Sequence, residues 1–154
     1  MDLKLGDKAP AFKLATDSGG EVTLSALKGG PFVLYFYPRD NTPGCTTEAI
    51  AFSSLAKKFR ALGVTVIGLS KDRPESHDRF KAKHALALTL ASDPETKTAQ
   101  AYGVWVEKTL YGKKSMGMER STFLVDGAGK IRGIWRKVKV DGHAEAVLAA
   151  AKLL

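Results

Sequence analysis

Residues 32–52 read FVLYFYPRDNTPGCTTEAIAF, and the change of pattern within this stretch decides the fold. The first six residues form an apolar, aromatic run of strand length, which is typical of a strand buried on both faces of a sheet. A loop rich in proline and glycine follows, and a helix pattern then begins near Cys45. Ala49, Phe52, Ala56 and Phe59 recur on one face of that helix. A strand that leads through a loop into an amphipathic helix predicts an α/β fold.

The rest of the chain continues as alternating strands and helices. We predict strands over 64–70 (VTVIGLS) and 86–92 (LALTLAS), helices over 73–85, 93–103 and 142–154, and an antiparallel hairpin over 120–136. In the 93–103 helix, Asp93 is the expected cap and Gly103 the expected stop. The pattern predicts a mixed central sheet flanked by helices, folded as a single domain over residues 1–154.

Length and composition limit the classes of function. A chain of 154 residues with 44% hydrophobic content suits one domain with a proper core. The longest apolar runs have strand length, so no membrane span is expected. The net charge of +8 is dispersed over several elements and has no stacking-aromatic or zinc-finger pattern beside it, so no nucleic-acid partner is expected.

No cofactor or metal is expected either. His77, His84 and His143 lack metal-ligand spacing, and the glycines near residue 127 suit a hairpin turn better than a phosphate loop. The chain has one cysteine and no leader pattern at its start, which indicates a reducing, cytoplasmic location.

Cys45 is the candidate nucleophile. It opens a helix, where Pro43 suits an early position and Thr42 is a candidate cap, so unpaired backbone N–H groups and the positive end of the helix dipole favour a thiolate. Its phase with the apolar face of the helix predicts a shallowly recessed sulfur at the floor of a pocket. The alternative is an inert, buried cysteine, and position alone leaves both interpretations open.

The surrounding residues resemble the peroxiredoxins, whose signature Pro-x-x-x-Thr-x-x-Cys stands here as Pro38, Thr42 and Cys45. More closely, the stretch is similar to the bacterioferritin comigratory protein, or peroxiredoxin Q, subfamily. The similarity continues through AYGVWVEKTLYGKKSMGMERSTFLVDGAGKI and KVKVDGHAEAVL, so it covers nearly the whole chain. The resemblance implies a thioredoxin-like fold and a thiol peroxidase.

The resemblance also implies a role for each site residue. Cys45 would be the peroxidatic nucleophile and Arg120 would stabilise its thiolate and the charge that develops on the peroxide. Thr42 would hold peroxide or thiolate through its hydroxyl, Pro38 would shield the sulfur from water, and Glu48 would orient Arg120. The plainer alternatives are a helix cap for Thr42, a strand-end proline for Pro38, a surface ion pair for Arg120 and an ordinary acidic residue in the first turn of a helix for Glu48.

One position departs from the subfamily pattern. Many members carry a resolving cysteine five residues after the peroxidatic one, where this chain has Ile50. The resemblance therefore implies a one-cysteine enzyme that reduces hydrogen peroxide and organic hydroperoxides and is regenerated by an external thiol. Thioredoxin, glutaredoxin and glutathione are the implied donors, and a monomer is expected, with a dimer as the alternative.

Two other functional classes remain at this stage. One is a thioredoxin-fold thiol-disulfide oxidoreductase, although these commonly use Cys-x-x-Cys and Glu48 occupies the second position here. The other is a non-catalytic redox sensor in which oxidation of Cys45 signals to a partner.

Overall fold

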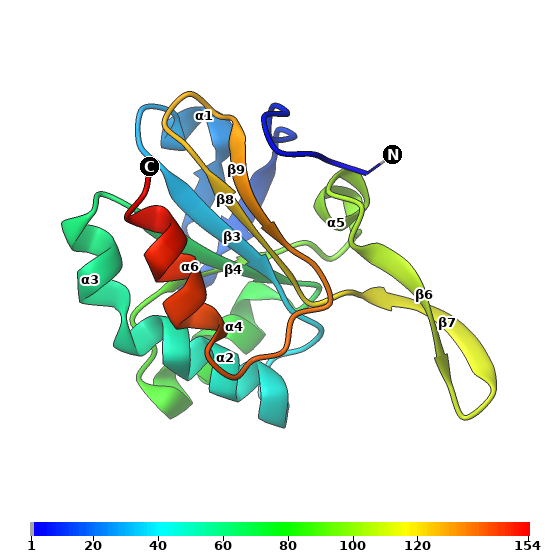
Figure 1. Cartoon of the computed structure of the whole chain (residues 1–154). Coiled ribbons are helices and arrows are strands. Elements are labelled where there is room, and N and C mark those ends of the chain that lie inside the picture. Colours follow the sequence, from blue (N-terminus) through cyan, green and yellow to red (C-terminus); the bar gives the residue numbers. More distant parts are fainter. Residues whose placement is uncertain (1) are drawn as a thin grey trace.

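The computed structural model describes residues 2–154 and is built on a seven-stranded sheet in the order β2-β1-β5-β4-β3-β8-β9 (Figure 1). The strands of this sheet are β1 Lys13–Thr16, β2 Glu21–Thr23, β3 Phe32–Phe36, β4 Thr65–Ser70, β5 Thr89–Ser92, β8 Ser121–Val125 and β9 Ile131–Trp135. The helices are η1 Asp17–Gly19, α1 Leu24–Leu27, α2 Pro43–Ser54, α3 Ala56–Ala61, α4 Pro74–His84, α5 Lys97–Ala101 and α6 His143–Ala151.

The sheet is mixed, as predicted. Strands β3, β4 and β5 are parallel neighbours, whereas β8 pairs antiparallel with β3 and β9 antiparallel with β8. All five residues of β3 are buried, since helices cover both faces of the sheet at its centre. The predicted hairpin over 120–136 is confirmed by the β8–β9 pair.

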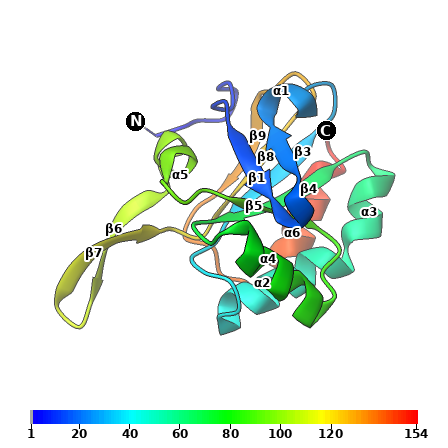
Figure 2. The same cartoon turned by 180° about the vertical axis from the view of Figure 1, so that it is seen from behind.

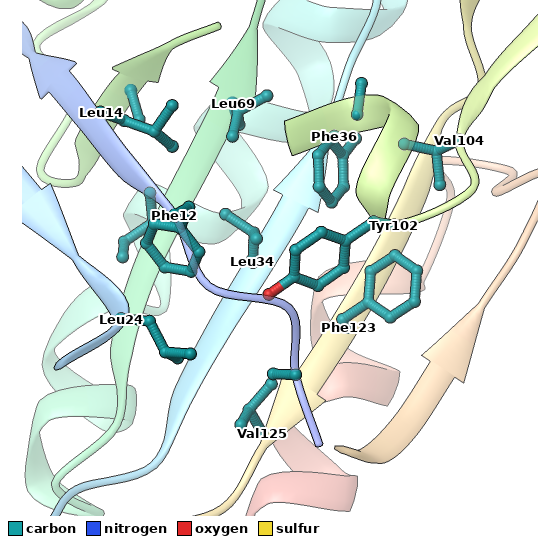
Figure 3. Close-up of a cluster of buried hydrophobic side chains, with 14 of the residues drawn as sticks. Phe12, Leu14, Leu24, Leu34, Phe36, Leu69, Tyr102, Val104, Phe123 and Val125 are labelled. Atoms are coloured by element: carbon teal, nitrogen blue, oxygen red, sulfur yellow. The ribbon is translucent and has the colours of Figure 1, made fainter. Parts of the chain in front are cut away.

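Two hydrophobic clusters fill the two sides of the sheet. Helices α2, α3, α4 and α6 cover one face through a cluster that includes Phe52, Phe59, Phe80 and Val147. The other face carries α1, α5 and the chain segment before β1 (Figure 2). Figure 3 shows this second cluster, in which the Tyr102 hydroxyl donates to the carbonyl of Pro10 at 2.8 Å.

Two predicted helices have different bounds in the structure. The helix predicted to open near Cys45 begins at Pro43 and is interrupted at Leu55, where the backbone amide bonds back to Phe52 and Ser53 instead of continuing the α-helical ladder, so α2 and α3 are separate. The predicted 93–103 helix begins only at Lys97, because Thr96 adopts a left-handed conformation with φ 59°. Asp93 still accepts hydrogen bonds from the first-turn amides of α5, as a capping residue does.

The sequence patterns did not reveal the arm formed by β6 Trp105–Leu110 and β7 Lys113–Met118, which projects from the body (Figures 1 and 2). A two-residue turn joins these strands, and its residues Tyr111 and Gly112 both have positive φ, as tight hairpins require. Most of the arm is exposed, so its strands lack the apolar pattern by which buried strands are recognised.

None of the helices within residues 2–154 is long and apolar enough to cross a membrane. Among the same residues, no group of three or more His, Cys, Asp and Glu side chains is arranged to hold a metal ion.

Candidate active site

The sheet register brings together two residues that lie far apart in the sequence. Strand β3 ends at Phe36, and the following loop leads into α2, which carries Cys45 in its first turn. In the antiparallel β3–β8 pair, Phe36 lies opposite Ser121, so the start of β8 lies beside the end of β3. Arg120 directly precedes β8 and therefore reaches the start of α2.

Cys45 is buried, with 2% of its surface exposed. Its predicted phase with the apolar face of the helix is confirmed, because Ala49 and Phe52 are buried in the same cluster. The sulfur is therefore more enclosed than the shallow recess predicted from the sequence. One guanidinium nitrogen of Arg120, Nη2, donates to Cys45 Sγ at 3.5 Å. The guanidinium and the helix start thus both place positive charge at the sulfur.

Arg120 is held from its other side by Glu48. The Arg120 Nη1 donates to Glu48 Oε1 at 2.7 Å, so the guanidinium bridges a carboxyl and the sulfur. Glu48 is 1% exposed, and this burial raises its pKa from 4.5 to about 7, although Arg120 acts in the opposite direction. Burial lowers the pKa of Arg120, but Glu48 and Cys45 outweigh this and raise it above its ordinary value.

The titration of Glu48 provides a stability prediction. Between pH 4.5 and 7 the folded chain holds a proton on Glu48 that the unfolded chain has released, so the free energy of unfolding falls as the pH rises. This loss of stability is absent below pH 4.5 and complete above pH 7. Glu48→Gln stays neutral, so we expect its stability relative to the wild type to improve by up to about 3 kcal/mol between pH 4 and pH 8.

Urea unfolding of both proteins at several pH values measures this difference. Glu95→Gln is the control, because Glu95 is an exposed carboxyl. Wild-type and Glu48→Gln stabilities that run parallel from pH 4 to pH 8 would contradict the raised pKa of Glu48.

Thr42 and Pro38 are placed differently from the expectation. Thr42 occupies the predicted N-cap position of α2, but its hydroxyl donates to the carbonyl of Arg39 at 2.9 Å and bonds to no amide of the helix, so the capping bond from its side chain is absent. Pro38 is exposed and lines a surface hollow of about 340 Å³ with Arg39, Lys71 and Asp72. The structure therefore brings Cys45, Arg120 and Glu48 together, whereas the shielding role of Pro38 stays a prediction.

Gly44 is a site residue that sequence reasoning missed. A Cβ atom at this position would lie 3.1 Å from Nη2 of Arg120, so the missing side chain leaves room for the guanidinium. A glycine inside a helix's first turn, where it costs helix stability, was the available signal.

A Gly44→Ala variant is therefore expected to displace the guanidinium by a few tenths of an ångström and to slow oxidation of Cys45 several-fold, roughly threefold to tenfold. Stopped-flow oxidation by hydrogen peroxide measures the change. Gly30→Ala is the control, because Gly30 lacks a positive φ and precedes the opposite end of β3 from the one that leads to Cys45; its added Cβ would meet only the Gly63 carbonyl, at 3.8 Å. An unchanged rate in Gly44→Ala would show that the close approach to Arg120 has no kinetic consequence.

The charges of the site also act on further buried polar groups around it. The Tyr35 hydroxyl and Glu48 Oε2 have no hydrogen-bond partner within the described part of the chain. Burial raises the pKa of Tyr35 well above 10, with Glu48 and Cys45 adding to the effect.

His143 begins α6, in agreement with the helix predicted over 142–154, and bonds through Nε2 to the Thr122 hydroxyl at 2.7 Å. Burial, followed by Arg120, lowers the pKa of His143 to about 4, so this imidazole is neutral at pH 7.

A single thiol at the start of a helix, a guanidinium bonded to it and a mixed sheet of this order define a thiol-dependent oxidoreductase of thioredoxin-like fold. The comparison with protein families specifies the class further. The model of the AhpC/TSA family matches residues 5–134, and the chain belongs to this family. It is a peroxiredoxin, that is, a thiol-dependent peroxidase.

Individual relatives agree with the predicted subfamily. The chain is 47% identical over 152 residues to peroxiredoxin Bcp of Bacillus subtilis, covering 99% of this chain and 97% of the relative. A structure of the Xanthomonas campestris bacterioferritin comigratory protein, studied for its alkyl peroxide reduction activity, matches with a TM-score of 0.89 and 46% identity over 92% of this chain and 90% of that one. A PrxQ mutant of Xylella fastidiosa matches with a TM-score of 0.94 and 39% identity, over 99% and 98% of the two chains. The predicted resemblance and fold class are confirmed.

Proposed function

We propose that Cys45 is the peroxidatic residue and that Arg120, Glu48 and Thr42 assist it. The observation that carries this assignment is the Arg120 guanidinium, which bonds to the sulfur through one nitrogen and to the buried Glu48 through another. The Cys45 thiolate attacks one oxygen of the hydroperoxide, an S–O bond forms and the O–O bond breaks. The products are a sulfenic acid and, once a proton has been taken up, water or an alcohol.

Each assisting group has a place in this step. Negative charge moves from the sulfur to the departing oxygen, and Arg120 is positioned to stabilise it at both atoms. Glu48 keeps the planar guanidinium in that orientation. Thr42, at the start of the same helix, can offer its hydroxyl to the peroxide when it releases the carbonyl of Arg39. Pro38 is assigned the shielding of the sulfur from water on the resemblance alone.

We propose hydrogen peroxide and alkyl hydroperoxides as substrates and an external thiol as the reductant. The relative from Xanthomonas campestris supports the alkyl substrates. Cys45 is the only cysteine of the chain, and Ile50 occupies the subfamily's resolving position on the exposed side of α2. The sulfenic acid therefore condenses with one external thiol to a mixed disulfide, releasing water, and a second thiol then attacks the external sulfur of that disulfide and releases the Cys45 thiol. Thioredoxin, glutaredoxin and glutathione are the candidate donors.

The experiment mixes fully reduced protein with stoichiometric hydrogen peroxide and follows tryptophan fluorescence by stopped flow and intact mass by spectrometry. Rapid addition of one oxygen, reversed by an added thiol, supports the peroxidase mechanism. Oxidation as slow as that of a free thiol would overturn it and favour a redox sensor. Reduction of disulfide substrates without peroxide turnover would favour an oxidoreductase. Repeating the reaction with cumene hydroperoxide and each of the three donors ranks substrates and reductants.

We also propose a single domain over residues 1–154 that works in the cytoplasm as a monomer. Both hydrophobic clusters share the same sheet, which supports one cooperative unit, and a lone cysteine suits a reducing compartment. Sedimentation at micromolar concentration in reduced and oxidised states tests the monomer against the alternative dimer.

A further inference from the structure

A second buried network lies beside the site and takes no part in the mechanism above. Its centre is Asp40, in the loop that joins β3 to α2 and carries Pro38 and Thr42. Asp40 Oδ1 accepts from the Tyr37 hydroxyl at 2.6 Å, and Oδ2 contacts His77 Nδ1 at 2.7 Å and accepts from the Ser76 hydroxyl at 2.8 Å. His77 is on α4 and is 0% exposed.

The partners of His77 determine where its protons lie. Its Nε2 is 2.9 Å from the carbonyl of Ala91 on β5, and a carbonyl only accepts, so Nε2 carries a proton. The contact between Nδ1 and Asp40 Oδ2 needs one further proton between the two atoms. The Asp40–His77 pair therefore links the loop to α4 and β5, and both imidazole nitrogens have a hydrogen-bond partner.

The backbone of the loop is fixed at the same place. The amide of Asp40 donates to Asp72 Oδ2 at 2.8 Å, and Asp72 in turn accepts from the Ser70 hydroxyl at the end of β4. The next residue, Asn41, has a φ of 60°, a left-handed conformation that asparagine adopts more readily than most residues, so the loop turns directly after its anchored residue.

We propose that Asp40 and His77 are positioning residues for the reaction at Cys45. By anchoring the loop to α4 and β5, they hold Thr42 and the first turn of α2 where the hydroperoxide must meet the sulfur and Arg120. Small displacements of reacting groups change a reaction rate strongly. Buried residues that do not touch the sulfur therefore affect the rate of its oxidation by holding the loop in place. This inference rests on the proposed function of Cys45.

The test uses the single variants Asp40→Ala and His77→Leu and the double variant that combines them. Each single variant leaves a buried polar partner without its bond and is expected to be less stable than the wild type. The double variant removes the pair but leaves the Tyr37 and Ser76 hydroxyls and the Ala91 carbonyl without it, so its loss of stability is expected to be smaller than the sum of the two single losses. In all three the loop has lost its anchor, so oxidation of Cys45 by hydrogen peroxide is expected to slow about tenfold.

Alkylation of Cys45 by iodoacetamide is the second measurement. Arg120 and the helix start still lie beside the sulfur in these variants, and a looser loop exposes the sulfur, so alkylation is not expected to slow. The control is Lys81→Met, which breaks the ion pair of the same helix α4 with the buried Asp17, at 2.7 Å, without touching the loop. Its stability is expected to fall while both rates stay within about twofold of the wild type.

Three results would overturn the proposal. The peroxide rate could stay near that of the wild type in the double variant, it could fall equally in Lys81→Met, or alkylation could slow in step with oxidation. A failure of the proposed function looks different, because the wild type itself would then react with peroxide no faster than a free thiol.

Discussion

Replacing Cys45 by serine is expected to abolish peroxide reduction. The sequence holds no second cysteine to take over the reaction. A serine hydroxyl stays protonated near neutral pH, and neither the helix start nor Arg120 converts it into a nucleophile comparable to a thiolate. Cysteine and serine differ by one atom, and residue 45 packs in the cluster that also holds Ala49 and Phe52. The fold of the variant is therefore expected to persist.

Consumption of hydrogen peroxide in the presence of dithiothreitol measures the loss, with the background rate of dithiothreitol alone subtracted. The melting temperature and circular dichroism of Cys45→Ser establish that the variant is folded. Peroxide turnover by this variant above the background would remove Cys45 from the mechanism and require a different reacting group.

Replacing Arg120 by methionine is expected to slow oxidation of Cys45 by about 10²–10³-fold, the usual effect of removing one donor that stabilises a developing charge. Methionine keeps much of the side-chain volume but removes the bonds to Cys45 Sγ and Glu48 Oε1.

Arg136→Met is the matched control. Arg136 forms an equivalent ion pair with Glu119, the residue before Arg120, and bonds to the carbonyl of Gly103. It makes no bond to Cys45, so its loss is expected to affect stability and leave the oxidation rate near that of the wild type. Equal rates for Arg120→Met and the wild type would show that the guanidinium does not act on the sulfur.

The buried part of the fold was predictable because its signals are local. The run in β3 is continuously apolar, and the turn between β8 and β9 carries the glycines that a hairpin requires, so both were recognised. The arm of β6 and β7 was missed, since exposed strands need no apolar alternation. The break at Leu55 was missed as well, because the apolar spacing continues across it from Phe52 to Phe59.

The candidate site likewise has one residue with a local signal in the sequence and others without such a signal. A lone cysteine in the first turn of a helix that follows a buried strand makes Cys45 a candidate nucleophile, because strand, loop and helix are contiguous, but position alone left an inert cysteine equally open. The remaining site residues came from the resemblance, and the need for glycine at residue 44 appeared only when Arg120 was seen beside it.

The sequence by itself therefore determined the α/β class, the place of a candidate nucleophile and the absence of an internal resolving cysteine, all of which depend on composition and on short-range patterns. Only the tertiary structure decided that Arg120 bonds to Cys45 and that His77 holds Asp40, residues 75 and 37 positions apart in the chain. Both contacts depend on how the elements assemble, the first on the antiparallel register that sets Phe36 opposite Ser121 and the second on the packing of α4 against the loop after β3. Long-range register and helix packing arise from the whole core, so no local pattern carries them.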